Sequence, residues 1–221
     1  MESKAYEYMD WPRIEAVVYG EEASPKDVMA PRLTTDGVLI QGFFPEADKT
    51  EVLVGSRKYE MEQEDEAGYF AAMIPGRKIP DYKYRVTKGE ETKEFADPYA
   101  FSGQITEAEE KAFCAGVYYH AYEKLGAHPM KINGVKGTSF AVWAPNAMRV
   151  SVVGDFNAWD GRCHAMHRMP MSGIFELFIP DVKAGDIYKY ELKLKGNRIE
   201  LKSDPYAACT EVPPANASVV T

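Results

Sequence analysis

The stretch GDFNAWDG, residues 154–161, is the part of this sequence whose residue types best suit contact with a ligand. It follows the apolar run VSVV and places Trp159 among aspartates, glycines and the amide of Asn157. A loop that exposes a flat indole beside polar groups suits a sugar, because sugar C–H faces stack on aromatic rings while the hydroxyls need donors and acceptors. We therefore interpret Trp159 as a stacking platform, with Asn157 either shaping the turn or contributing its amide.

The other chemistry-bearing residues form no pattern typical of a catalytic or metal centre. His164 and His167 make an HxxH without a cysteine or carboxylate at zinc spacing, so we expect solvated loop histidines. No GxSxG, P-loop or GxGxxG motif occurs, and nothing indicates carboxylates that converge across a cleft. The sequence therefore predicts no catalytic residue, no metal and no cofactor.

Composition and charge exclude several classes of partner. The 221 residues carry a formal net charge of -8, which opposes association with nucleic acid and with anionic lipid. No run of 18 apolar residues and no signal-peptide pattern is present, so neither membrane spanning nor secretion is predicted. The three cysteines are odd in number and far apart, which indicates reduced thiols in a cytoplasm: Cys114, Cys163 and Cys209.

The loop belongs to the second of two internal repeats, offset by about 100 residues. Five blocks recur in the same order. Residues 37–47 align with 137–147, Val52 with Val152, GYFAAMIPG from Gly68 with GIFELFIPD from Gly173, YKYRV from Tyr82 with YKYEL from Tyr188, and ADPYAF from Ala96 with SDPYAA from Ser203. Five matched blocks in one order indicate two copies of one module.

Each copy has the alternation of half-buried strands. Its runs are separated by Gly, Pro, Asn or Asp, which predicts antiparallel sandwiches. We therefore predict an all-β protein with two tandem immunoglobulin-like sandwiches, and we place Trp143, within FAVWAP, in the core. The clearest example sets an apolar face, Tyr188, Tyr190, Leu192 and Leu194, against a charged face, Lys189, Glu191, Lys193 and Lys195.

Helical patterns lie only at the starts of the modules and between them. Ser24 followed by Pro25 is typical of a helix start, and Thr106 with Glu109 makes a capping box. We expect the second helix to hold the two modules in a defined relation. The predicted division is a first module at 1–105, a helical connector at 106–127 and a second module at 128–221.

The second half resembles a known family. GDFNAWDG, together with YEKLGAHP, FAVWAPNA, YKYEL, DPYA and the terminal ASVV, is similar to the family-48 carbohydrate-binding module of bacterial 1,4-α-glucan branching enzymes. The first half resembles their extra N-terminal module more weakly, through SPKDVMAPR, although Arg32 stands where that pattern has histidine. In related glycogen-binding modules the loop tryptophan stacks on glucose and a lysine of the YK strand bonds hydroxyls, which implies Trp159 and Lys189 here.

The resemblance implies a non-catalytic region that positions α-glucan, glycogen or a maltooligosaccharide, for a family-13 catalytic barrel of roughly 250 residues that this chain does not contain. It also implies that DPYA packs on that barrel through Asp204, Pro205 and Tyr206. Related modules carry a second aromatic on the hairpin after the YK strand, where this chain has KGNRIELK. A purely structural turn, with its tryptophan packed on its own module or on the barrel, and a stand-alone glycogen-binding adaptor therefore remain the alternatives.

Overall fold

The computed structural model describes residues 4–221, and its first half is a β-sandwich preceded by short helices. The helical elements of this half are η1 (Tyr6–Tyr8), α1 (Trp11–Val18), α2 (Pro25–Met29) and η2 (Pro98–Ala100). Its strands are β1 (Arg32–Leu33), β2 (Val38–Phe43), β3 (Lys49–Val54), β4 (Arg57–Glu60), β5 (Glu62–Asp65), β6 (Tyr69–Ile74), β7 (Lys83–Lys88) and β8 (Glu91–Phe95).

The second half is again built from strands. Its helical elements are α3 (Glu107–Cys114), η3 (Ala121–Glu123) and η4 (Asp155–Asn157). Its strands are β9 (Gly126–Ile132), β10 (Val135–Trp143), β11 (Arg149–Gly154), β12 (His167–Arg168), β13 (Ile174–Pro180), β14 (Ile187–Leu194), β15 (Arg198–Lys202), β16 (Cys209–Thr210) and β17 (Ser218–Val219).

Each half is a pair of antiparallel sheets. In the first, the order β1-β2-β6-β5 faces the order β4-β3-β7-β8. In the second, β12-β13-β10-β9 faces β11-β14-β17-β16, and β15 pairs with β14. The prediction of an all-β fold with sandwich modules is confirmed.

The internal repeat is reproduced strand by strand. β2 pairs with β6 as β10 pairs with β13, and β3 pairs with β7 as β11 pairs with β14. Two glycines show that the match extends to single positions. Gly68 and Gly173 both have positive φ, and a Cβ at either would lie within 3 Å of backbone in the preceding turn, at Phe44 and Pro145 respectively. Because a side chain at either position would clash, both copies need glycine at this crossing.

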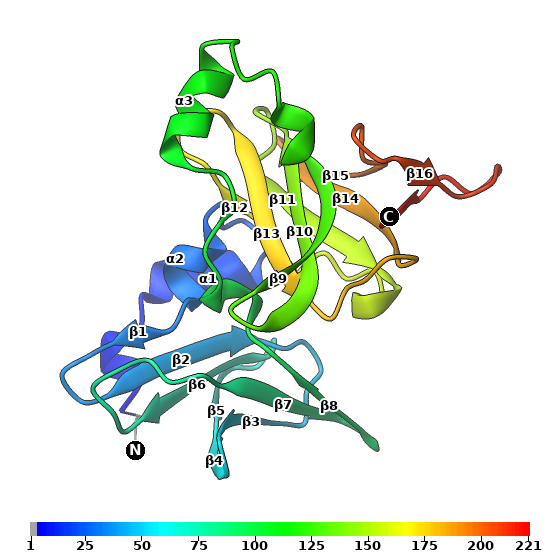
Figure 1. Cartoon of the computed structure of the whole chain (residues 1–221). Coiled ribbons are helices and arrows are strands. Elements are labelled where there is room, and N and C mark those ends of the chain that lie inside the picture. Colours follow the sequence, from blue (N-terminus) through cyan, green and yellow to red (C-terminus); the bar gives the residue numbers. More distant parts are fainter. Residues whose placement is uncertain (1–3) are drawn as a thin grey trace.

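Helices α1 and α2 lie between the two sandwiches (Figure 1). The β2–β6 face that points away from β3 and β7 is covered by α1 and α2, so strand β2 is buried along its whole length. One continuous apolar cluster runs from Ile14 and Met29 in the helices through Leu39 to Phe140 in the second sandwich. The interior of the first sandwich is a separate cluster that includes Val52 and Tyr84. The two modules therefore share a core through the N-terminal helices.

The predicted connector differs from the structure in length and in role. The capping box of Thr106 and Glu109 is present, but α3 ends at Cys114 and strand β9 already begins at Gly126. Figure 1 shows α3 at the end of the second sandwich that points away from the first. The buried carboxylate of Glu110 accepts bonds of 2.9 Å from the backbone N–H groups of Met171 and Ser172, which fixes α3 there. The expectation that this helix holds the modules together is wrong, because α1 and α2 do so.

The division of the chain at residues 105 and 128 stays a prediction. No helix among residues 4–221 is long and apolar enough to cross a membrane.

Candidate functional site

The Trp159 loop is built around the amide of Asn157. The oxygen of that amide accepts the Gly154 N–H at 2.9 Å, and its nitrogen donates to the carbonyl of Val152 at 2.9 Å and to Nδ1 of His164 at 2.9 Å. Both N–H groups are therefore used within the module. This geometry supports the turn-shaping alternative for Asn157 over direct contact with a ligand.

Trp159 is held at the surface by an unusual backbone. Ala158 and Trp159 have φ of 53° and 61°, a left-handed conformation that is costly for a bulky side chain. The indole N–H donates to Oδ1 of Asp155 at 2.8 Å, and the side chain is only half-buried. With its N–H occupied, the ring offers its apolar surface for contact, as a stacking platform requires.

Lys189 lies on the neighbouring strand, at the end that carries the loop. The β11–β14 register sets Lys189 opposite Val153 and Tyr188 opposite Gly154. Tyr188 and Tyr190 point into the core, so Lys189 is on the outer face, as the alternation predicts. Its ammonium donates to the side chain of Asn216, which belongs to the segment before β17. The role of Lys189 in bonding sugar hydroxyls stays a prediction.

Strand β15 follows β14 and carries exposed aliphatic residues where related modules have an aromatic ring. Ile199 and Leu201 are both exposed. Strand β15 therefore adds no aromatic ring to the one that Trp159 offers.

The DPYA segment divides into an internal and an external part. Oδ2 of Asp204 accepts the hydroxyls of Tyr188 at 2.6 Å and Tyr190 at 3.2 Å, while Oδ1 accepts the Tyr206 N–H at 2.8 Å. Burial raises the pKa of Asp204 above its ordinary value. Pro205 and Tyr206 are exposed, Tyr206 at 44%. Asp204 thus acts inside the module, and it positions the segment that displays Pro205 and Tyr206.

Trp143 was predicted in the core, and that prediction is wrong. It is 55% exposed, its indole N–H donates to the carbonyl of Ser172 at 2.9 Å, and its ring packs edge-on against Phe113. The sequence contains a signal for this position. Phe140 and Val142 are buried on the inner face of β10, so the period of two places Trp143 on the outer face.

The two loop histidines were expected to be solvated, and His164 is not. It is partly buried beside Phe156, and burial lowers its pKa to about 4. His167 lies in strand β12, and its Nδ1 is buried without a partner. No group of three metal-ligating side chains occurs within residues 4–221.

Comparison with protein families first defines the class of each half. Residues 124–207 match the family described as carbohydrate-binding module 48 (isoamylase N-terminal domain). Residues 10–99 match the family described as alpha-1,4-glucan branching enzyme GlgB, N-terminal domain. The chain therefore belongs to the N-terminal region of the GlgB branching-enzyme family, with a carbohydrate-binding module as its second half.

Curated relatives agree with this assignment over the whole chain. A 1,4-alpha-glucan branching enzyme GlgB of Cereibacter sphaeroides is 42% identical over 222 residues, which cover 99% of this chain and 30% of the relative. That of Synechococcus elongatus is 39% identical over 215 residues, 94% of this chain and 28% of the relative. The chain thus spans less than a third of their length. Among solved structures, a pullulanase of Anoxybacillus sp. LM18-11 in complex with maltotetraose matches 87% of this chain and 26% of its own, with 20% identity and a TM-score of 0.38.

Proposed function

We propose that this chain positions α-glucan for the catalytic domain of a 1,4-α-glucan branching enzyme, which cleaves an α-1,4 bond and rejoins the chain as α-1,6. The observation that carries the proposal is the half-buried indole of Trp159, which donates to Asp155 from a left-handed backbone within the segment that matches a carbohydrate-binding module. Lys189, on the outer face of the adjacent strand, supplies a donor for sugar hydroxyls.

The partner of the second module, in this proposal, is the catalytic barrel. Its docking surface includes Pro205 and Tyr206, presented by the buried Asp204. Ile199 and Leu201 on β15 belong to the same module, and their side chains add to its exposed apolar surface. The proposed modules are residues 1–105 and 128–221, with 106–127 between them.

The proposal assigns catalysis to the remainder of the enzyme and not to this chain. The span of 30% of a relative's length supports this division. An iodine-staining branching assay on this polypeptide should show no change in glucan staining, and clear turnover would contradict the assignment. We place the protein in the cytoplasm, which its three free cysteines support.

The test of the glucan site is the affinity for glycogen of the 221-residue chain and of Trp159→Ala, measured by affinity electrophoresis. Loss of one stacking surface should weaken binding about tenfold, equivalent to about 1.4 kcal/mol. Trp143→Ala is the matched control, because it removes an exposed indole from another part of the same module. Equal affinity of Trp159→Ala and the unaltered chain would remove Trp159 from the site, and absence of binding by both would favour a purely architectural role. If the unaltered chain binds glycogen strongly without the catalytic barrel, a stand-alone adaptor is favoured instead.

A further inference from the structure

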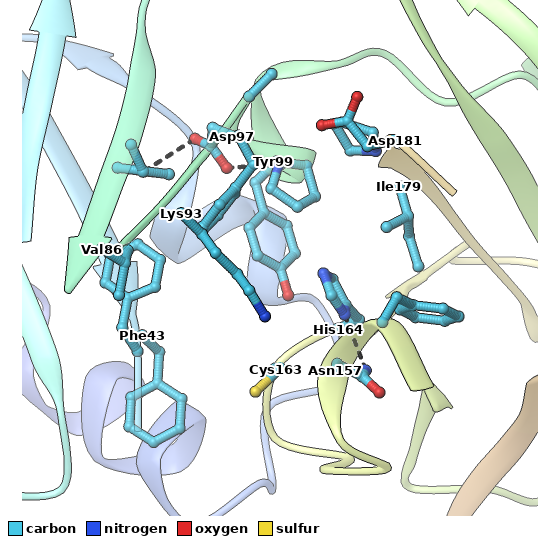
Figure 2. Close-up of a pocket in the computed structure, with 18 of the residues that line it drawn as sticks. Phe43, Val86, Lys93, Asp97, Tyr99, Asn157, Cys163, His164, Ile179 and Asp181 are labelled. Atoms are coloured by element: carbon cyan, nitrogen blue, oxygen red, sulfur yellow. Dashed lines mark hydrogen bonds between the residues drawn. The ribbon is translucent and has the colours of Figure 1, made fainter. Parts of the chain in front are cut away.

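A cavity of about 480 Å³ lies where the two sandwiches meet (Figure 2). Its wall comes from both halves of the chain: Phe43, Val86 and Tyr99 belong to the first, and His164 and Ile179 to the second. Its volume falls in the range of small-molecule sites, about 300 to 1,000 Å³. Because neither half encloses it alone, no single stretch of sequence predicts it.

The wall is largely apolar, with a smaller number of polar groups. Aromatic rings of Phe43, Phe44 and Phe156 face it together with aliphatic side chains of both modules. Lys93 and Asp181 are both exposed, and in Figure 2 the side chain of Lys93 extends toward Tyr99 and His164. Apolar walls with a few polar groups suit a ligand that has both apolar faces and hydroxyls.

His164 supplies one defined donor toward the cavity. The oxygen of Asn157 is fixed by the Gly154 N–H, so the amide nitrogen is the atom that faces Nδ1 of His164, 2.9 Å away. Nδ1 must then accept, and the proton of the neutral ring is on Nε2. Nε2 has no partner among the described residues and is not sealed off from solvent. His164 therefore presents an N–H donor.

The charge of the cavity disfavours an anionic ligand, because three carboxylates line it, Glu94, Asp97 and Asp181, against one cation, Lys93. Burial lowers the pKa of His164 to about 4 and raises the pKa of the Cys163 thiol to about 12, so both are uncharged near neutral pH. Lys93, the cation that lines the cavity, is paired with Glu91 at 3.1 Å, and Glu94 is its neighbour in the lining. A phosphorylated ligand would meet one neutralised cation, which is too little to offset its desolvation.

We infer that this junction cavity is a second carbohydrate site, which takes a terminal glucosyl unit of a short α-glucan against its aromatic wall with His164 Nε2 donating to a hydroxyl. The choice of an α-glucan over other neutral sugars rests on the proposed function. Since the cavity exists only while the sandwiches are docked, its ligand would bind and stabilise the docked arrangement.

The test is a titration of the isotopically labelled 221-residue chain with maltotriose, followed by amide NMR shifts. Resonances of Tyr99 and Ile179 report the cavity, and those of Asp155 and Ala158 report the loop. Val86→Trp, which fills the cavity from the first module, should weaken the cavity response at least tenfold and leave the loop response unchanged. Trp159→Ala should do the reverse.

A second variant guards against misfolding of the first. Cys163→Trp fills the same cavity from the second module and should have the same effect on Tyr99 and Ile179. A loop response without any cavity response would overturn this inference and leave the proposed function intact. A cavity response that survives both filling variants would also overturn it. If neither region responds to maltotriose, the proposed function and this inference both fail.

Discussion

The two sandwiches keep the same interior hydrogen-bond network and differ at their surfaces. In the first, the hydroxyls of Tyr82 and Tyr84 donate to Oδ2 of Asp97, and the Tyr99 N–H donates to Oδ1 at 2.8 Å. In the second, Tyr188, Tyr190 and the Tyr206 N–H make the same contacts with Asp204. Both carboxylates are buried, and burial raises the pKa of each.

The two copies differ in one loop and in the exposure of one turn tyrosine. After β3 the first copy turns through Gly55 into β4, whereas after β11 the second copy enters the Trp159 loop. Tyr99 is buried and its hydroxyl donates to the carbonyl of Ala165 at 3.0 Å, across the junction between the modules. Its counterpart Tyr206 is exposed. The same turn therefore docks one module onto the next and remains open in the other, where we propose that the catalytic barrel docks.

The largest expected effect tests whether the networks are equivalent. Asp97→Ala and Asp204→Ala each leave one tyrosine hydroxyl, that of Tyr82 or Tyr188, and one backbone N–H without an acceptor, while Tyr84 and Tyr190 keep the carbonyls of Gln41 and Ala141. We expect each to lower the free energy of unfolding by about 4 kcal/mol, because bonds to a charged acceptor contribute about 1.5 to 3 kcal/mol each and part of this offsets carboxylate burial. Urea denaturation measures this loss. A loss at only one of the two positions would show that the copies differ inside as well as outside.

A pH series tests the burial of Asp97. Its folded-state pKa is about 6, above the ordinary 3.8, so its contribution to stability is full below pH 3.8 and is lost as pH rises through 6. The difference corresponds to about 3 kcal/mol. The stability of the unaltered chain relative to Asp97→Asn should therefore rise by about that amount from pH 7 to pH 4. The comparison with Asp204→Asn should change in the same direction. If the stability difference does not change with pH for either variant, the raised pKa of the two buried carboxyl groups is contradicted.

The third prediction concerns the two turn tyrosines. Tyr99→Phe removes the bond to Ala165 and leaves a buried carbonyl unpaired, so we expect a loss of about 1 kcal/mol in the free energy of unfolding. Tyr206→Phe should change stability by less than about 0.5 kcal/mol, as is usual for exposed sites. Thermal unfolding of both variants gives the comparison. Equal losses would indicate that Tyr206 is already packed against its own module.

The smallest effect compares the equivalent lysines of the two YK strands. Lys189→Met should weaken glycogen binding about threefold, since a single hydrogen bond contributes about 0.5 to 1.5 kcal/mol. Lys83→Met, at the matching position of the first module, should leave the affinity unchanged. Affinity electrophoresis with both variants decides the point, and an equal effect of the two would place sugar contact in both modules.

Local rules predicted much of the fold. The alternation of YKYEL, the repeated glycines and the Thr106 capping box depend on neighbours in the chain, and each has its expected structure. Lys193 shows where such rules fail. Alternation placed it on a charged face, but it is only 6% exposed, because its ammonium donates to the Tyr19 carbonyl at 3.1 Å and pairs with Glu21 at 3.2 Å.

Local patterns also predicted part of the candidate site. The motif located Trp159 at the surface, and the period of two located Lys189 on the outer face. The burial of Asp204 and the junction cavity depend on segments that are distant in sequence. Their positions are set by packing between strands and between modules, which a single sequence does not display.

The position of α1 and α2 has a consequence for how the chain acquires its structure during synthesis. Ala23, just before α2, accepts the N–H of Arg168, and Tyr19, just after α1, accepts the ammonium of Lys193. The ribosome makes these helices first, yet the surface that covers their far side appears roughly 150 residues later, or about 10 to 30 seconds at ordinary rates of translation. Until then the apolar side chains on that side stay exposed to solvent, and such transiently exposed surface is prone to aggregation.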